Sequence, residues 1–176
     1  MIKRIEEYFL YFITYSVIGW IYEVFLETVI YGWGFSNRGV LFGPYCPVYG
    51  VGALIFILTV NKLIAKRDKA CRLKLIPVVF LLCMLIATFV ELLTTYILEY
   101  FTGGWPWQTY GDYAINFQAR IALNPSVRFG IGGVIILYII QPVLEKSVMN
   151  FKYRKYGAVS IAAIFAADII YTFFVK

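Results

Sequence analysis

The sequence predicts an all-α membrane protein, and three observations carry that prediction. Hydrophobic residues make up 61% of the 176 residues and charged residues only 15%, far from the composition of a soluble globular domain. The apolar residues form long runs, and short polar clusters separate these runs. Lysine and arginine concentrate in alternate clusters. We therefore expect a polytopic helix bundle that forms a single transmembrane domain over residues 1–176.

Five apolar runs reach or approach the roughly 20 residues that a spanning helix needs. They cover about Tyr8–Tyr31, Tyr45–Ala65, Leu75–Phe101, Ser126–Glu145 and Tyr156–Val175. The first run contains two carboxylates, and no small-residue cleavage site follows it. We therefore expect a retained span rather than a signal peptide.

The basic residues predict the orientation of these spans. Twelve of the sixteen would lie on one side of the membrane: Lys3, Arg4, Lys62, Lys66, Arg67, Lys69, Arg72, Lys74, Lys146, Lys152, Arg154 and Lys155. The other four are Arg38, Arg120, Arg128 and Lys176. An excess of lysine and arginine marks the cytoplasmic side, so we predict a cytoplasmic N-terminus and a C-terminus outside. This alternation does not suit a phosphate-tracking face, and we expect no nucleic-acid partner.

Several kinds of chemistry lack their usual residues. The chain has no G-x-x-x-x-G-K-[ST] loop for nucleotide hydrolysis. It has no histidine, the commonest general base and metal ligand. Cys46, Cys71 and Cys83 form no C-x-x-C pair, so a disulfide framework is not expected. We predict no metal site, no cofactor and no catalytic residue.

The segment near residues 37–50 should interrupt the helices. Pro44 and Pro47 each lack a backbone donor, and each biases the preceding residue away from helical torsions. Irregular backbone at membrane depth persists only where protein buries it or where it lines a cavity. We expect a broken or re-entrant segment whose free N–H groups could bind an anionic group, with Arg38 close by.

The connection over residues 102–125 is long and rich in aromatic residues, with little serine or lysine. Its composition argues against disorder, so we predict an ordered outer loop. Two interpretations remain open: an aromatic belt at the lipid headgroups, or a lid over an outward-facing cavity. The belt would not require Asp112, Asn116 and Arg120.

Intramembrane carboxylates point to a possible site. Glu23, Glu91 and Asp168 fall in the outer half of three spans that run outward, with Glu27 one turn beyond Glu23. An uncompensated charge at mid-bilayer costs about 2.5–3.5 kcal/mol, so these groups should face inward and pair with arginine. Structural ion pairs that lock the bundle are one interpretation. We favour the other, an outward-open polar pocket.

Several blocks of the chain resemble a known bacterial family, the CmpB-type ABC-transporter permeases of type IV. The blocks are Tyr15–Glu23, Asn37–Gly39, Gly43–Gly50, Glu91 and Asn116–Asn124, within about residues 9–145. The chain has Phe117-Gln118-Ala119-Arg120 where the family tends to show Asn-Gly-Arg. The resemblance implies a multi-pass protein of the bacterial plasma membrane and a shared site.

These observations together predict a permease-like transport subunit that binds a small charged or zwitterionic solute. The expected ligand-binding residues are Trp20, Glu23, Asn37, Arg38, Tyr45, Glu91, Asn116, Arg120 and Asn124. The expected partners are the lipid bilayer and the solute. Because five spans are few for a complete transporter, we also expect a separate ATPase or a homo-oligomer. Two alternatives remain: a membrane-embedded enzyme that acts on lipid headgroups with Glu23 and Glu91 as acid and base, and a structural or sensory subunit.

Overall fold

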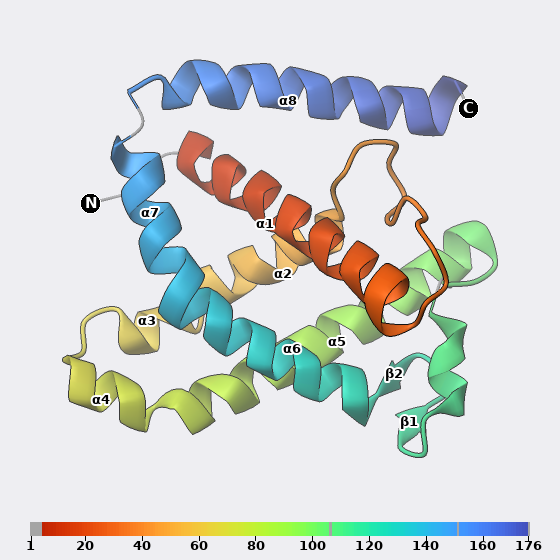
Figure 1. The fold of residues 1–176 in the computed structure, drawn as a ribbon, viewed down its shortest axis with the longest axis horizontal. Coiled ribbons are helices and arrows are strands. Elements are labelled where there is room, and N and C mark those ends of the chain that lie inside the picture. Colours follow the sequence, from red (N-terminus) through yellow and green to blue (C-terminus); the bar gives the residue numbers. More distant parts are fainter. Residues whose placement is uncertain (1–4, 106, 151, 176) are drawn as a thin grey trace. The chain divides into compact units, whose positions relative to one another are not determined.

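The structure is a computed structural model that describes residues 5–105, 107–150 and 152–175. Lys3, Arg4 and Lys176, which contribute to the predicted orientation, lie outside the described residues. The described chain is helical apart from its connections and one two-stranded hairpin, as the composition predicted (Figure 1).

Each of the five predicted apolar runs is helical. The segments are α1 (Ile5–Phe25) with the π-helix η1 (Leu26–Ile30), α2 (Pro47–Leu58) followed by α3 (Asn61–Ile64), α5 (Ile76–Thr102), α6 (Leu123–Ile135) continued by the π-helix η3 (Ile136–Ile140) and α7 (Gln141–Asn150), and α8 (Arg154–Ile170) with the π-helix η4 (Tyr171–Val175). A short helix, α4 (Lys69–Lys74), precedes α5.

Four of these segments are long and apolar enough to cross a membrane. They are Ile5–Ile30, Pro47–Ile64, Ile76–Phe101 and Leu123–Val148. Such runs have no stable place in water, so the chain is a multi-pass membrane protein. The last helical segment, α8 with η4, is not among the four, and five spans with an outside C-terminus stay predictions.

The helix boundaries follow the local chemistry that the sequence indicates. Residues 31–46 are not helical, and α2 begins at Pro47, where a missing backbone donor is tolerated. Gly103 ends α5 with a left-handed φ of 77°, and its N–H donates to the Glu99 carbonyl. The proline residues therefore interrupt the helices as predicted, whereas re-entry of this segment into a membrane stays a prediction.

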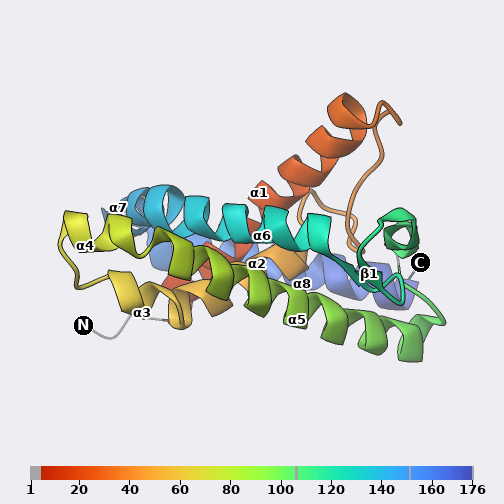
Figure 2. The ribbon, with the colours of Figure 1, turned by 90° about the horizontal axis from the view of Figure 1, so that it is seen from below.

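Two compact units make up the chain, and each is described by itself. Unit 1 comprises Met1–Leu54 and Pro142–Lys176, and unit 2 comprises Ile55–Gln141. In unit 2, α5 and α6 lie side by side (Figure 2). A Cβ on Gly130 would lie 2.6 Å from Phe80, and one on Gly133 would lie 2.4 Å from Cys83, so both glycines permit this close approach.

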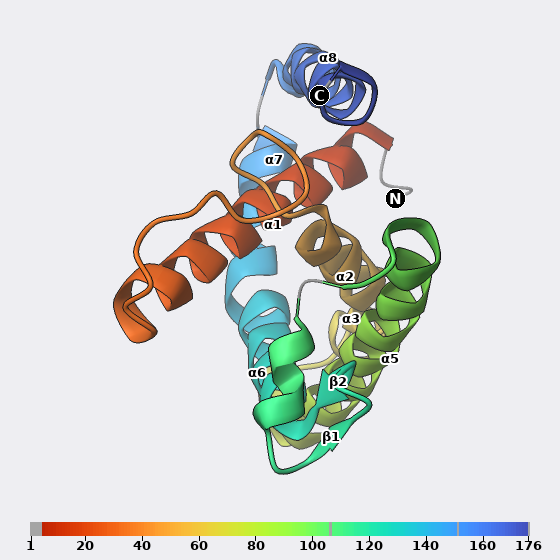
Figure 3. The same ribbon diagram turned by 90° about the vertical axis from the view of Figure 1, so that its right-hand side faces the viewer.

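The connection between α5 and α6 is folded. It contains a short 3₁₀ helix, η2 (Gln108–Asp112), and strands β1 (Asn116–Phe117) and β2 (Ile121–Ala122). The strands pair antiparallel in the register Asn116↔Ala122 and Phe117↔Ile121 (Figure 3). Gln118 and Ala119 form the turn with φ of 53° and 55°, positive as in a type I′ hairpin. Its position outside the membrane stays a prediction.

Candidate functional site

Two glycines in unit 1 bring α1 and the start of α2 into close contact. A Cβ on Gly19 would lie 2.3 Å from the Tyr49 ring, and one on Gly50 would lie 2.3 Å from the Ser16 hydroxyl. The Cys46 N–H donates to the Ser16 carbonyl at 2.9 Å. With the backbones this close, the Tyr49 hydroxyl donates to the Glu23 carboxylate. The motif around Glu23 therefore packs against the segment that follows the broken loop.

The loop between η1 and α2 is tied to α1 by an amide. Trp20 Nε1 donates to Asn37 Oδ1 at 2.8 Å, and Asn37 Nδ2 donates to the Phe42 carbonyl at 2.8 Å. Trp20 also packs edge-on against Phe35, with 6.4 Å between ring centroids. Asn37 thereby joins α1 to both arms of the loop.

Glu27 pairs with an arginine of the loop before α2. Its Oε1 lies 3.3 Å from Arg38 Nη1, and its Oε2 accepts a hydrogen bond of 2.6 Å from Ser36. Glu27 is buried, whereas the Arg38 side chain is 40% exposed. Arg38 therefore neutralises a buried charge and still reaches solvent.

Glu23 and Arg38 each lie near Cys46. Both charged groups lie within electrostatic range of the buried Cys46 thiol. A Cβ on Gly39 would lie 3.2 Å from that sulfur, which shows how closely the loop covers it. Cys46 is therefore a small buried side chain beneath the loop.

The backbone N–H groups of the broken segment bind an anionic group, and that group belongs to the protein. Asp168 of α8 accepts hydrogen bonds from Phe42 N at 3.1 Å, Gly43 N at 2.8 Å and the Tyr45 hydroxyl. Thr172 Oγ1 adds a fourth donor at 3.0 Å. We name this arrangement the carboxylate nest: two consecutive amides and a tyrosine hydroxyl that hold one carboxylate.

In unit 2, Glu91 accepts a hydrogen bond from a tyrosine. Glu91 is buried on α5, and its Oε1 accepts a hydrogen bond of 2.9 Å from the Tyr110 hydroxyl. Tyr110 belongs to η2, so the connection between α5 and α6 folds back over α5.

Arg120 lies between two aromatic rings. Its guanidinium carbon is 4.2 Å from the centroid of Tyr96 and 4.2 Å from that of Trp105, and Nη2 lies 2.6 Å from Glu99 Oε2. The Arg120 carbonyl accepts a hydrogen bond of 3.0 Å from Trp107 Nε1. These contacts attach the hairpin to the C-terminal part of α5.

The two remaining predicted residues lie in exposed positions. Asn116 closes the hairpin: its Nδ2 donates to the Tyr113 carbonyl at 2.8 Å, and its Oδ1 accepts from Ala119 N at 3.2 Å. Asn124 is exposed in the first turn of α6. Asn116 thus shapes the turn of the hairpin.

The nine predicted residues fall into two groups. Unit 1 brings together Trp20, Glu23, Asn37, Arg38 and Tyr45 around the loop before α2. Unit 2 contains Glu91, Asn116, Arg120 and Asn124 in or beside the connection that precedes α6. A single pocket that combines Glu23, Glu91 and Arg120 stays a prediction.

Sequence reasoning missed several partners in both groups. They are Ser36, Tyr49, Tyr96, Glu99, Trp107 and Tyr110. Gly19 and Gly50 carried a usable signal, because a glycine in each of two apolar helices permits close contact. The other partners lie nine or more positions away from the groups they bind, so no local pattern indicates them.

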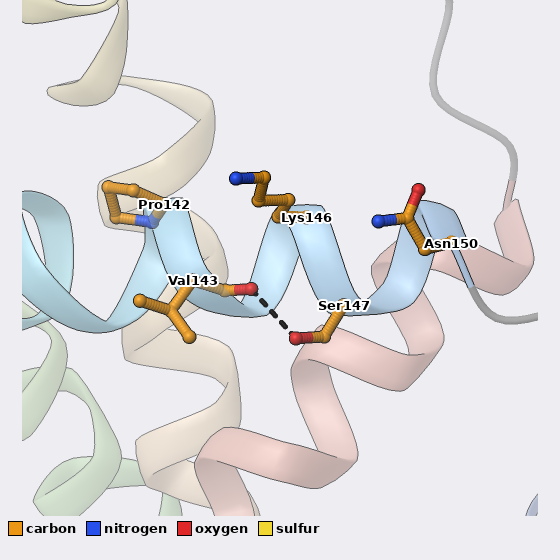
Figure 4. Close-up of a pocket in the computed structure, with 5 residues that line it drawn as sticks. All are labelled: Pro142, Val143, Lys146, Ser147 and Asn150. Atoms are coloured by element: carbon orange, nitrogen blue, oxygen red, sulfur yellow. Dashed lines mark hydrogen bonds between the residues drawn. The ribbon is translucent and has the colours of Figure 1, made fainter.

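A shallow depression of about 510 Å³ lies on α7, where Pro142, Val143, Lys146, Ser147 and Asn150 form one exposed face (Figure 4). The Ser147 hydroxyl donates to the Val143 carbonyl at 3.0 Å. None of the nine predicted residues lines this depression. Among the described residues, no group of three or more cysteine, aspartate or glutamate side chains could hold a metal ion.

Comparison with known proteins identifies the family. No curated protein and no solved structure matched the chain. A family model described as "Putative ABC-transporter type IV" matches residues 10–173. The match extends through α8, beyond the residues for which the sequence motifs had indicated a resemblance. The chain, with its apolar helices and its charged loop before α2, belongs to the ABC-transporter type IV (CmpB) family.

Proposed function

We propose that the protein is a permease-like transport subunit that binds a small charged or zwitterionic solute. The solute would bind at the unit 1 cluster, by which we mean Trp20, Glu23, Asn37, Arg38 and Tyr45. Membership of an ABC-transporter-type family and four apolar helices support a role in transport. In such an assembly, nucleotide hydrolysis would come from a separate ATPase, because this chain carries no phosphate-binding loop.

The carboxylate nest is the observation that carries the proposal. Its two amides and tyrosine hydroxyl already hold a carboxylate, that of Asp168. A carboxylate on a solute offers the same acceptor geometry and could replace Asp168. A structural ion pair alone would not need two consecutive backbone N–H groups aimed at one anion.

Charges of both signs near the nest suit a zwitterion. Glu23 would attract a cationic group of the solute, whereas Arg38, with 40% of its side chain exposed, would attract a second anionic group. Trp20 and Asn37 hold the loop that carries Arg38. Binding a polar solute here would exchange internal partners for external ones, which keeps the energetic cost of opening low.

The proposal is tested by the substitution Glu23→Gln, with Glu6→Gln on the same helix as the matched control. The purified protein is screened by thermal unfolding against amino acids, betaines and short dicarboxylates. We expect at least one solute to raise the Tm of the natural protein and of the control, but not of Glu23→Gln. In proteoliposomes, the natural protein and the Glu6→Gln control should let the same solute exchange across the membrane, whereas Glu23→Gln should not.

Two outcomes would contradict the proposal. If the solute stabilises Glu23→Gln as well as the natural protein, Glu23 belongs to the scaffold. The second outcome is that no solute stabilises the natural protein, while mass spectrometry shows that membranes containing the protein have a changed lipid headgroup. That result would support the enzyme alternative instead.

A further inference from the structure

Unit 2 has a basic surface that plays no part in the proposed solute site. We name residues 62–74 the basic hairpin: the end of α3, a turn and α4 (Figure 1). It carries six cationic residues, Lys62, Lys66, Arg67, Lys69, Arg72 and Lys74, of which all but Arg72 are exposed. The ordering of this surface and its place in the chain both bear on what binds it.

The hairpin is ordered by its own contacts. Asp68, the one acidic residue between Lys62 and Lys74, caps α4 by accepting from Ala70 N at 3.1 Å and Cys71 N at 3.2 Å. The Tyr138 hydroxyl donates to the Arg72 carbonyl at 2.7 Å, and the Arg72 guanidinium lies 5.5 Å from the Tyr138 ring centroid. The cations therefore lie on a folded element that contacts η3. The carboxylate of Asp68 is occupied by backbone N–H groups.

The position of the hairpin indicates a lipid surface. It connects one candidate span that ends at Ile64 to another that begins at Ile76, so both of its ends are held at the same membrane face. Leu63 is 44% exposed and Leu73 is 55% exposed, and both stand beside lysine residues. Apolar side chains next to cations are typical of an element that lies at the headgroup boundary.

We propose that the basic hairpin binds the phosphate groups of anionic phospholipids in the leaflet it faces. Clustered lysine and arginine at the end of a span attract anionic headgroups, and the attraction is effective within about 10 Å at moderate salt. The exposed leucines would reach the acyl boundary while the cations contact phosphate. The site is independent of the unit 1 cluster, and it holds whether or not that cluster binds a solute.

The test compares nanodiscs of phosphatidylcholine with nanodiscs of an equal mixture of phosphatidylcholine and phosphatidylglycerol. The proteins are the natural chain, the variant Lys66→Gln/Arg67→Gln/Lys69→Gln/Lys74→Gln, and a control, Lys152→Gln/Lys155→Gln, which removes exposed charges elsewhere. Thermal unfolding and hydrogen exchange over residues 62–74 are measured at low salt and at about 1 M salt, where the screening length falls to about 3 Å.

We expect the mixed lipid to raise the Tm of the natural chain and of the control at low salt, and to slow hydrogen exchange several-fold in the hairpin. Both effects should vanish at high salt and in the quadruple variant. Unchanged exchange in the natural chain would overturn the proposal even if the variant fails to fold. An equal loss in the control would show a general charge effect, and equal protection by polyglutamate in neutral nanodiscs would indicate an acidic protein partner; either result overturns it.

Discussion

At the scale of single residues, the site in unit 1 depends on side chains that are missing rather than present. Gly19 leaves the space that the Tyr49 ring occupies, and Gly50 leaves the space next to Ser16. The contact between Tyr49 and Glu23 exists because the two backbones approach this closely. The sequence indicated that the charge of Glu23 is energetically costly within an apolar span. It could not indicate the partner, Tyr49, because that contact is tertiary and no local pattern encodes it.

Gly19→Ala tests this dependence, and Gly52→Ala is its matched control. A Cβ at Gly19 would meet Tyr49 at 2.3 Å, whereas one at Gly52 meets nothing within 4 Å. Overpacking of this kind costs about 1–3 kcal/mol, so we expect Gly19→Ala to lower the Tm measured in detergent. Gly52→Ala should leave it unchanged or raise it slightly, because alanine favours helix. Equal Tm values for the two variants would contradict the close contact.

At the scale of elements, arginine and tryptophan attach the hairpin to α5. Trp105 and Trp107 donate to the carbonyls of Ala119 and Arg120, both at 3.0 Å. The aromatic composition of residues 102–125 predicted order, and the described part of this connection contains η2, β1 and β2. The composition could not predict that Arg120 stacks between Tyr96 and Trp105, since these rings come from separate elements.

Arg120→Lys should release the β1–β2 hairpin from α5, although the substitution keeps the positive charge. Lysine lacks the planar group that stacks on two rings, and a cation–π contact contributes about 0.5–2 kcal/mol. We expect faster hydrogen exchange over residues 107–122 and little change in α6. Arg67→Lys, an exposed arginine of the basic hairpin, is the control and should leave both regions unchanged. Unaltered exchange in Arg120→Lys would mean that the tryptophan hydrogen bonds suffice.

At the scale of the whole molecule, hydropathy predicted the helices well because the length of an apolar run is a local property. All five predicted runs are helical, and their ends shift by a few residues. The pairings within the site could not be predicted in this way. Asp168 meets Gly43 across 125 positions, and only the fold brings them together. The sequence identified the cost of each buried charge but not the group that compensates it.

Native Cys71 can report which side the basic hairpin faces. Cys46 and Cys83 are buried, whereas Cys71 is partly exposed in α4. The excess of lysine and arginine predicts a cytoplasmic hairpin. We therefore expect a membrane-impermeant maleimide to label intact cells only after they are permeabilised, and Cys71→Ser to abolish that labelling. Labelling of intact cells through Cys71 would reverse the predicted orientation.

The direction of α8 within unit 1 bears on the fifth span. Arg154, its first residue, lies 3.3 Å from Glu7 near the start of α1, and Phe165 packs against Phe12 at 5.6 Å between ring centroids. Near its end, Asp168 reaches the loop that follows η1. Both helices thus run in the same sense, so a membrane that α1 crosses outward should also be crossed outward by α8. At the C-terminus, an alkaline phosphatase fusion should then be active and a green fluorescent protein fusion should be dark. Fusions after Asn150 should give the opposite pattern. If both fusion sites give the same pattern, α8 does not cross the membrane and stays on the cytoplasmic side.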